Sequence, residues 1–264
     1  MTSQATTRTS PKTWEAAMAD PWLRTTISVP ASRCGPPGMV NGGWVSGTVA
    51  GHLGSGPVEV LLRNPTPLDS PLELRAADND AVLMDGTTVL VAARRVPAPP
   101  MPPAPVTPTE ALAAEARFEG HDDHPFPGCF VCGTERADGD GLRLFSGPVG
   151  GRPGAVAGLF VPRPGHGAAD GRIPPATVWA ALDCPTAWPH MRPGAAALLG
   201  RIRGQVFSTP VVDQPYVVVG EATGEDGRKL YSRSAVYDRS GSLVGVAEAT
   251  WISISLGPGA GSAE

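Results

Sequence analysis

The sequence lacks long apolar runs, because no stretch reaches the ~20 residues that a helix needs to span a bilayer. Its first residues, MTSQATTRTSPKTW, contain no apolar segment of the kind found in signal peptides. We therefore expect a cytoplasmic protein that does not associate with membranes. Four cysteines in 264 residues are also too few for a disulfide scaffold.

Runs of one charge are absent as well. The 21 Lys and Arg residues and the 25 Asp and Glu residues are spread along the chain, and the formal net charge is −4. This distribution argues against nucleic acid as a partner. With 41% hydrophobic residues, the chain can build one large or two small domains, each with its own core.

Turn residues, in contrast, are abundant: the chain has 33 Gly and 30 Pro. Much of the proline lies in the segment VPAPPMPPAPVTPTE, whose composition favours a stiff, extended linker. The predicted organisation is a flexible N-terminal arm (1–20), an N-terminal unit (21–96), the Pro-rich linker (97–110), a C-terminal unit (111–256) and a tail (257–264).

The two units are weak copies of each other. Short alternating runs rich in β-branched residues predict strands, and each unit has one apolar helix. Gly86, Val91 and Ala92 share one offset with Gly241, Val246 and Ala247 at the last predicted strand, and PLDSP loosely matches PVVDQP. The first unit is predicted to have strands at 24–30, 58–64, 72–80, 81–85 and 87–96 with a helix at 39–53. The second is predicted to have strands at 141–147, 155–162, 196–207, 216–223, 230–238 and 243–255 with a helix at 174–184.

The second predicted helix, in RIPPATVWAALDCPTAW, contains one unexpected residue. Pro174 and Pro175 suit a helix start, and the following residues are apolar around most of the helix. Asp183 then lies on an apolar face with no basic residue at helical spacing, where an unpaired charge is costly. Because Pro185 disfavours a helical conformation at the residue before it, we expect Asp183 near a helix end or kink. Asp183 is either a functional carboxylate or a helix-end residue bonded to loop amides.

One helix followed by a meander of antiparallel strands, twice over, resembles the hotdog fold. The resemblance covers most of residues 20–256. It implies an α+β double hotdog, with two antiparallel sheets that each wrap a central helix. Because hotdog units pair through their helices, the helices at 40–53 and 174–184 should be antiparallel and adjacent. A homodimer of such chains is a further expectation.

Many hotdog thioesterases of the phenylacetyl-CoA type carry His-Gly-Gly at the start of the central helix and an acid eight residues after that His. One site takes its two parts from different subunits. This chain has Asn41-Gly42-Gly43 in the first unit but Val49 eight residues after Asn41. In the second unit Asp183 is present, but the residue eight positions before it is a proline. The surviving parts are complementary, so the resemblance implies one composite site.

In that site Asp183 would be the base or nucleophile, and Asn41 would bind a carbonyl or orient a water. The amides of Gly42 and Gly43 would stabilise an oxyanion, because amides at a helix start are unpaired donors. NGG on its own is also a common helix entry. The second pair, Pro175 against Val49, would be inactive.

The expected function is hydrolysis of acyl thioesters, with acyl-CoA or an acyl-carrier protein as substrate and no cofactor. Trp179, Arg201 and Arg203 are the further candidates for substrate binding, since the two arginines alternate on one strand and could meet phosphate groups. Such arginines more often form a solvated strand face. The alternatives are a hotdog hydratase or dehydratase, which pairs an Asp with a His, and a non-catalytic acyl-binding protein.

The motif Cys129-x-x-Cys132, with His121 and His124 upstream, invites a zinc interpretation, because zinc favours thiolate and imidazole ligands. The chain has only one such pair, and the histidines do not follow a typical finger spacing. The stretch also resembles the C-x-x-C-G…G-L entry of many hotdog proteins, where it is a structural turn. We therefore expect a structural role and no metal.

Cys184 follows Asp183 directly in the sequence. A small buried cysteine is more often a core residue than a nucleophile. A nucleophilic thiol would need a nearby histidine, and the closest one in the sequence is His190.

Overall fold

The computed structural model describes residues 22–255 as three α-helices, eleven strands and short 3₁₀ turns. The predicted N-terminal arm (1–20) and tail (257–264) lie outside the described residues. The first unit comprises β1 (Leu23–Ile27), α1 (Gly42–Gly51), β2 (Val58–Leu62), β3 (Leu72–Ala76), β4 (Asp80–Asp85) and β5 (Thr88–Arg95). The second comprises α2 (Pro108–Glu115), β6 (Gly147–Pro148), β7 (Ala155–Phe160), α3 (Pro175–Ala187), β8 (Ala196–Val206), β9 (Tyr216–Asp226), β10 (Lys229–Tyr237) and β11 (Leu243–Ile254).

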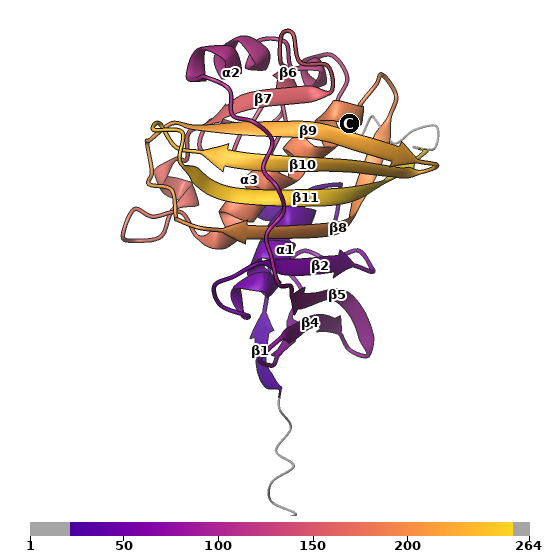
Figure 1. Cartoon of the computed structure of the whole chain (residues 1–264). Helices are drawn as coiled ribbons and strands as arrows, with labels where there is room; N and C mark the ends of the chain where they lie inside the picture. The colour runs from indigo at the N-terminus through magenta and orange to yellow at the C-terminus, as the bar shows by residue number, and fades with distance from the viewer. Residues whose placement is uncertain (1–21, 256–264) are drawn as a thin grey trace, which may run out of the picture.

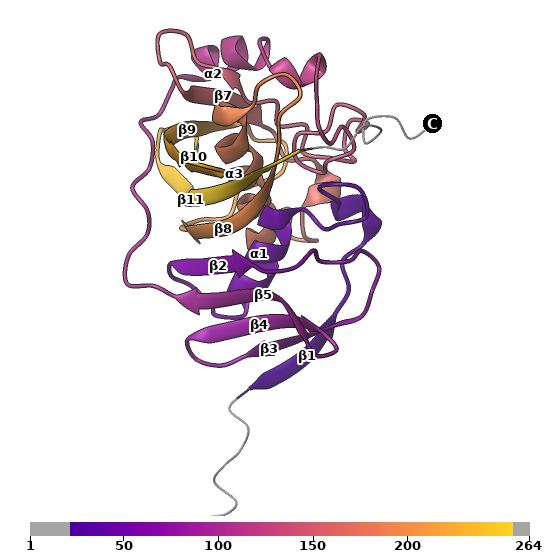
Figure 2. The ribbon, with the colours of Figure 1, turned by 90° about the vertical axis from the view of Figure 1, so that its right-hand side faces the viewer.

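The strands form one continuous sheet of 11 strands, in the order β1-β3-β4-β5-β2-β8-β11-β10-β9-β7-β6. The two sheets expected from the sequence are therefore joined edge to edge. β2 pairs antiparallel with β8, from Val58 opposite Gly204 to Leu61 opposite Arg201. Each unit contributes the strand that follows its own helix, and the pairing covers an edge that would otherwise be open to another chain. Figures 1 and 2 show the two units stacked along this seam.

The helices α1 and α3 lie side by side on one face of the sheet and are antiparallel, as predicted. A Cβ atom on Gly43 would lie 2.4 Å from Asp183 Cβ, and one on Gly47 would lie 2.6 Å from Trp179 Cβ. As residue numbers increase along α1, the numbers of the facing residues on α3 therefore decrease. These two glycines let the helix backbones approach closely, and the main apolar core surrounds the helix pair.

Helix α3 continues through Pro185 to Ala187, beyond its predicted end at Cys184. A proline inside a helix removes the amide donor to the carbonyl four residues earlier, here that of Ala181, and two hydroxyl groups donate to the next two carbonyls along the helix. Ser234 Oγ donates to the Leu182 carbonyl at 2.6 Å, and Thr186 Oγ1 donates to the Asp183 carbonyl at 2.5 Å. Asp183 therefore lies in the last turns of a continuous helix.

The Pro-rich segment after β5 crosses the outer face of the sheet, opposite the α1–α3 pair, before it reaches α2 (Figures 1 and 2). α2 begins at Pro108, inside the predicted linker, with a capping box between Thr107 and Glu110. This helix packs against β7 and covers a second apolar cluster on the outer face, formed by Ala111, Ala114, Val149, Ala155, Ala157, Val217, Val219, Ala235 and Tyr237. The sheet is thus covered on both faces where β7, β9 and β10 meet α2.

The predicted strand at 141–147 is wrong. Arg143 has a φ of 48°, which is incompatible with extended backbone. The amides of Leu142 and Leu144 donate instead to the carbonyls of Phe130 and Val131. Residues 141–146 are consequently a loop that packs onto the Cys129–Cys132 turn, and only Gly147 belongs to a strand, β6.

The backbone confirms the internal repeat at both matched stretches. Asp69 and Asp213, the aspartates of PLDSP and PVVDQP, both have left-handed backbones with φ of 52° and 57°. Gly86 and Gly241 also have positive φ, 55° and 81°, in the turns that lead into β5 and β11. A positive φ is rare for a non-glycine residue, so its occurrence at matched positions is strong evidence of equivalence.

Candidate functional site

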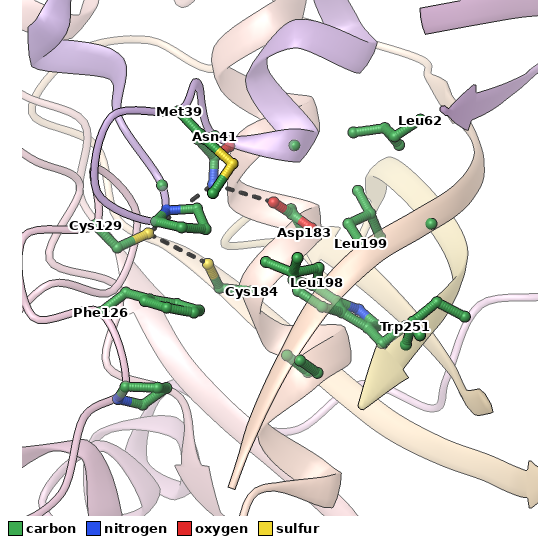
Figure 3. Close-up of a pocket in the computed structure, with 18 of the residues that line it drawn as sticks. Met39, Asn41, Leu62, Phe126, Cys129, Asp183, Cys184, Leu198, Leu199 and Trp251 are labelled. Atoms are coloured by element: carbon green, nitrogen blue, oxygen red, sulfur yellow. Dashed lines mark hydrogen bonds between the residues drawn. The ribbon is translucent and has the colours of Figure 1, made fainter. Parts of the chain in front are cut away.

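A cavity of about 300 Å³ lies where the start of α1, the end of α3, β8, β11 and the 124–132 loop meet. Figure 3 shows side chains from these elements converging on it. Its walls are mainly apolar and include Met39, Leu62, Phe126, Trp188, Met191, Leu198, Leu199 and Trp251. Such a cavity suits an apolar ligand that carries a few polar groups.

Asp183 is the carboxylate in this cavity, and both expected partners from the first unit contact it. Its Oδ2 accepts a hydrogen bond from the Gly43 amide at 2.8 Å and another from Asn41 Nδ2 at 3.1 Å. Asn41 is also the N-cap of α1, because its Oδ1 accepts from the Trp44 amide at 2.9 Å. Asp183 is 1% exposed, and its Oδ1 is buried without a hydrogen-bond partner among the described residues.

The environment makes this carboxyl more basic than an exposed one. Burial raises the pKa of Asp183 to about 7, although the hydrogen bonds from Gly43 and Asn41 favour the charged form. The positive end of the α1 dipole acts in the same direction as these donors. A carboxyl with a pKa near neutrality can accept a proton from a reacting group and release it again.

The two glycine amides play different parts, contrary to expectation. The Gly43 amide is already bound to Asp183, so it is not free for a substrate. Among the described residues the Gly42 amide has no hydrogen-bond partner. Gly42 lines the cavity, and a Cβ there would lie 2.9 Å from Leu199 Cδ2. The start of α1 therefore offers one free donor to the cavity.

The structure does not bring Arg201 and Arg203 to the cavity. Ile202 between them is fully buried, so strand alternation turns both arginines to the opposite, outer face of the sheet. Arg201 Nε donates to Glu59 at 2.7 Å, and Arg203 Nη2 donates to Glu248 at 2.9 Å. They contribute to an ion-pair network across the β2–β8 seam.

Trp179 does not line the cavity either. It is 4% exposed and lies between α1 and β8, against Gly47 and Gly204. Its role is to fill the space at the crossing of the two helices.

The second potential site lacks the counterparts of Asn41 and Asp183. Val49 is fully buried in the core, and α3 begins with Pro174 as N-cap and Pro175 as its first residue. Since proline has no amide hydrogen, these two positions offer no donor. The combination of an Asn N-cap and a facing carboxylate occurs only where the start of α1 meets Asp183, among the described residues of these two helices.

Three thiols that the sequence did not connect also line the cavity. The sulfur atoms of Cys129, Cys132 and Cys184 all lie within 4.8 Å of one another, and all three residues are buried. Hydrogen bonds from the Cys132 and Cys184 thiols hold the pKa of Cys129 well below its ordinary value. His190, the closest histidine in sequence to Cys184, instead binds Glu225 and Ser232.

His124 is the histidine in the cavity wall, but both of its ring nitrogens have backbone partners. Nε2 lies 3.1 Å from the Cys132 carbonyl, and Nδ1 accepts from the Phe126 amide at 3.0 Å. Burial lowers its pKa, which favours the neutral ring. His124 therefore supports the loop rather than presenting a free nitrogen.

No protein-family model and no curated protein matches the chain, but solved structures do. The tesB protein of Mycobacterium avium subsp. paratuberculosis has a TM-score of 0.57 at 15% identity, over 88% of this chain and 93% of that one. A conserved protein of unknown function with a hot dog fold, from Alicyclobacillus acidocaldarius, has a TM-score of 0.58 at 13% identity, over 89% of this chain and 94% of that one. The acyl-CoA thioesterase II TesB2 of Mycobacterium marinum has a TM-score of 0.51 at 10% identity, over 90% of this chain and 95% of that one.

These similarities extend over nearly the whole length of each protein, so the fold is the double hotdog predicted from the sequence. In residues 22–255 no helix combines the length and apolar character that crossing a bilayer requires.

Proposed function

We propose that the protein hydrolyses acyl thioesters, with acyl-CoA as the substrate class, at one composite site. The observation that carries this proposal is the position of Asp183, which lies in an apolar cavity and is bound by Asn41 and Gly43 of the other unit. Two structures of the same fold have names that include tesB or acyl-CoA thioesterase, which supports the proposal.

In the proposed reaction the acyl group occupies the apolar cavity and its carbonyl oxygen accepts a hydrogen bond from the free Gly42 amide. The Asp183 carboxylate takes a proton from a water molecule as that water attacks the carbonyl carbon. The resulting oxyanion is stabilised by the Gly42 donor and the positive end of α1. The C–S bond then breaks, and the proton held by Asp183 passes to the leaving thiolate.

The hydratase alternative is less well supported. That chemistry needs a histidine as the acid-base partner of the aspartate, and both nitrogens of His124 are already bonded to backbone groups. The non-catalytic alternative makes Asp183 only a partner that caps the start of α1. In this alternative Asp183 needs no charge, because the amide oxygen of an asparagine can also accept a hydrogen bond from Gly43. A general base, in contrast, must be a carboxylate.

The test is hydrolysis of a panel of acyl-CoA substrates, followed with a thiol-reactive dye, in the wild type and in Asp183→Asn. We expect turnover to fall by about 10²–10⁴-fold, the range for loss of a general base. Asn41→Ala should cost less, roughly tenfold to a hundredfold, because the Gly42 donor remains. Full activity in Asp183→Asn would remove Asp183 from the mechanism.

The matched control is Asp85→Asn, since Asp85 is an exposed carboxylate at the end of β4 and does not line the cavity. Its activity should equal that of the wild type. Thermal unfolding of Asp183→Asn should show a folded protein, because the variant removes a buried charge and keeps an acceptor for Gly43. No hydrolysis of any acyl-CoA by the wild type, combined with tight acyl-CoA binding, would favour the non-catalytic alternative.

A further inference from the structure

We propose, in place of the metal-free structural turn expected from the sequence, that Cys129, Cys132 and Cys184 form a binding site for one zinc ion per chain. The structure brings the third thiol from α3 to the Cys-x-x-Cys turn, a juxtaposition that sequence spacing does not reveal, since Cys129 and Cys184 are 55 positions apart. The three sulfur atoms form the one such cluster of candidate metal ligands among the described residues.

The spacing of the sulfur atoms fits a tetrahedral metal. Zinc–sulfur bonds are about 2.3 Å long, so two thiolates on a tetrahedral ion lie about 3.8 Å apart. Cys129 Sγ and Cys184 Sγ are 3.8 Å apart, and the third sulfur lies within 4.8 Å of both. A small rotation of the Cys132 side chain would therefore complete a set of three ligands.

The turn that carries two of the thiols also places donors near sulfur. The amides of Val131 and Cys132 donate to Cys129 Sγ, and Asn41 Nδ2 approaches it at 3.9 Å. Such donors offset the negative charge of a metal-bound thiolate. Gly133 closes the turn by donating its amide to the Cys129 carbonyl at 2.9 Å, and a Cβ at this position would lie 2.4 Å from that oxygen.

The fourth coordination position is open to the cavity, because all three cysteines line it (Figure 3 shows Cys129 and Cys184). A water molecule can occupy that position, as in zinc sites with three protein ligands. The ion would join the loop between α2 and β6 to helix α3. Zinc suits this donor set, since it prefers thiolates and has no redox chemistry of its own.

The test is the metal content of protein purified with a reductant and without a chelator, measured by mass spectrometry. We expect one zinc per chain in the wild type and almost none in Cys129→Ser and Cys184→Ser. The matched control is Cys34→Ser, because Cys34 lies outside the cluster and its Sγ instead contacts the Gly128 carbonyl. This control should keep the full zinc content.

A second measurement on the wild type does not depend on the folding of the variants. After zinc removal and reduction, one equivalent of Co²⁺ should give the intense visible bands and sulfur charge-transfer bands of tetrahedral thiolate coordination. Wild-type protein that contains no zinc and binds no Co²⁺ would overturn the proposal, as would full metal content in Cys184→Ser. Since these assays measure metal and not turnover, their outcome is separate from that of the hydrolysis test.

Discussion

The closest approach of the two helices provides a sharp test of the structure, through the substitution Gly43→Ala. A Cβ at this position would lie 2.4 Å from Asp183 Cβ and 2.6 Å from the Trp179 carbonyl oxygen. Neither atom is the end of a flexible side chain, so the helices must move apart. The Gly43 amide and Asp183 Oδ2, now 2.8 Å apart, would then separate.

The expected change in the unfolding free energy of Gly43→Ala is the balance of two opposing effects. Overpacking a well-packed core costs about 1–3 kcal/mol. Replacing a helical glycine with alanine returns up to about 1 kcal/mol through backbone entropy. With two contacts to atoms that cannot rotate away, we expect Gly43→Ala to lose about 2 kcal/mol of unfolding free energy. A displacement of the reacting groups by about 1 Å should also lower turnover by roughly 10²-fold.

Two other glycines of α1 provide the controls. At Gly51 a Cβ would meet no atom within 4 Å, so Gly51→Ala should leave activity unchanged and stabilise the fold slightly. At Gly47 a Cβ would lie 2.6 Å from Trp179 Cβ and 2.7 Å from Ala176 Cα, away from Asp183. Gly47→Ala should therefore destabilise the protein about as much as Gly43→Ala but retain more activity.

The assays are urea unfolding and acyl-CoA hydrolysis on the three variants and the wild type. If Gly43→Ala matched Gly51→Ala in both stability and turnover, the close helix crossing described here would be incorrect. Equal activity in Gly43→Ala and Gly47→Ala would show that the Gly43–Asp183 contact does not contribute to catalysis.

Three further predictions concern the β2–β8 seam and the Val49–Pro175 pair. Hydrogen bonds from Arg201 and Arg94 outweigh burial and lower the pKa of Glu59 below 4.5, so Glu59 contributes stability above that pH and loses it as the pH falls further. The difference in unfolding free energy between Glu59→Gln and the wild type should accordingly be constant above about pH 5 and shrink in acid, and a difference that grows in acid would contradict the ion-pair assignment. Arg201→Ala should leave the KM for acyl-CoA unchanged, because Arg201 lies on the outer face; a tenfold rise would return it to the substrate site. Val49→Asp should lose stability, measured by urea unfolding, because it buries an unpaired charge. It should also gain no activity, since Pro175, which stands where Asn41 stands in the other pair, offers neither a side-chain nor an amide donor, and a gain in turnover would contradict the asymmetry of the two pairs.

The strands and the two central helices could be predicted because their patterns are local. Alternation of apolar residues marks β8 to β11, and the matched aspartates and glycines mark the repeat. α2 was missed because proline dominates its surroundings. The sequence did hold a signal for it, since Thr107 and Glu110 form a capping box around Pro108 at the first helical position.

The candidate site, like the fold, could be predicted from the sequence only in part. The juxtaposition of Asn41 and Gly43 with Asp183 was inferred from a family resemblance, and the structure places these residues within hydrogen-bond distance. The approach of Cys184 to Cys129 could not be predicted, because it depends on how a loop packs against α3. Arg201 and Arg203 were misplaced because strand alternation gives the two faces but not which of them meets the helices.

The seam between β2 and β8 has a consequence for how the chain folds. Glu59 and Arg201, which form an ion pair across it, are 142 positions apart in sequence, so this pairing closes a very long loop. Contacts of such large sequence separation slow folding, because the entropy of closure is lost before the strands pair. Until they pair, each unit exposes an unprotected strand edge. We therefore expect the two halves, if produced separately by cutting the Pro-rich segment, to self-associate through β2 or β8, and to recover a monodisperse state when they are folded together.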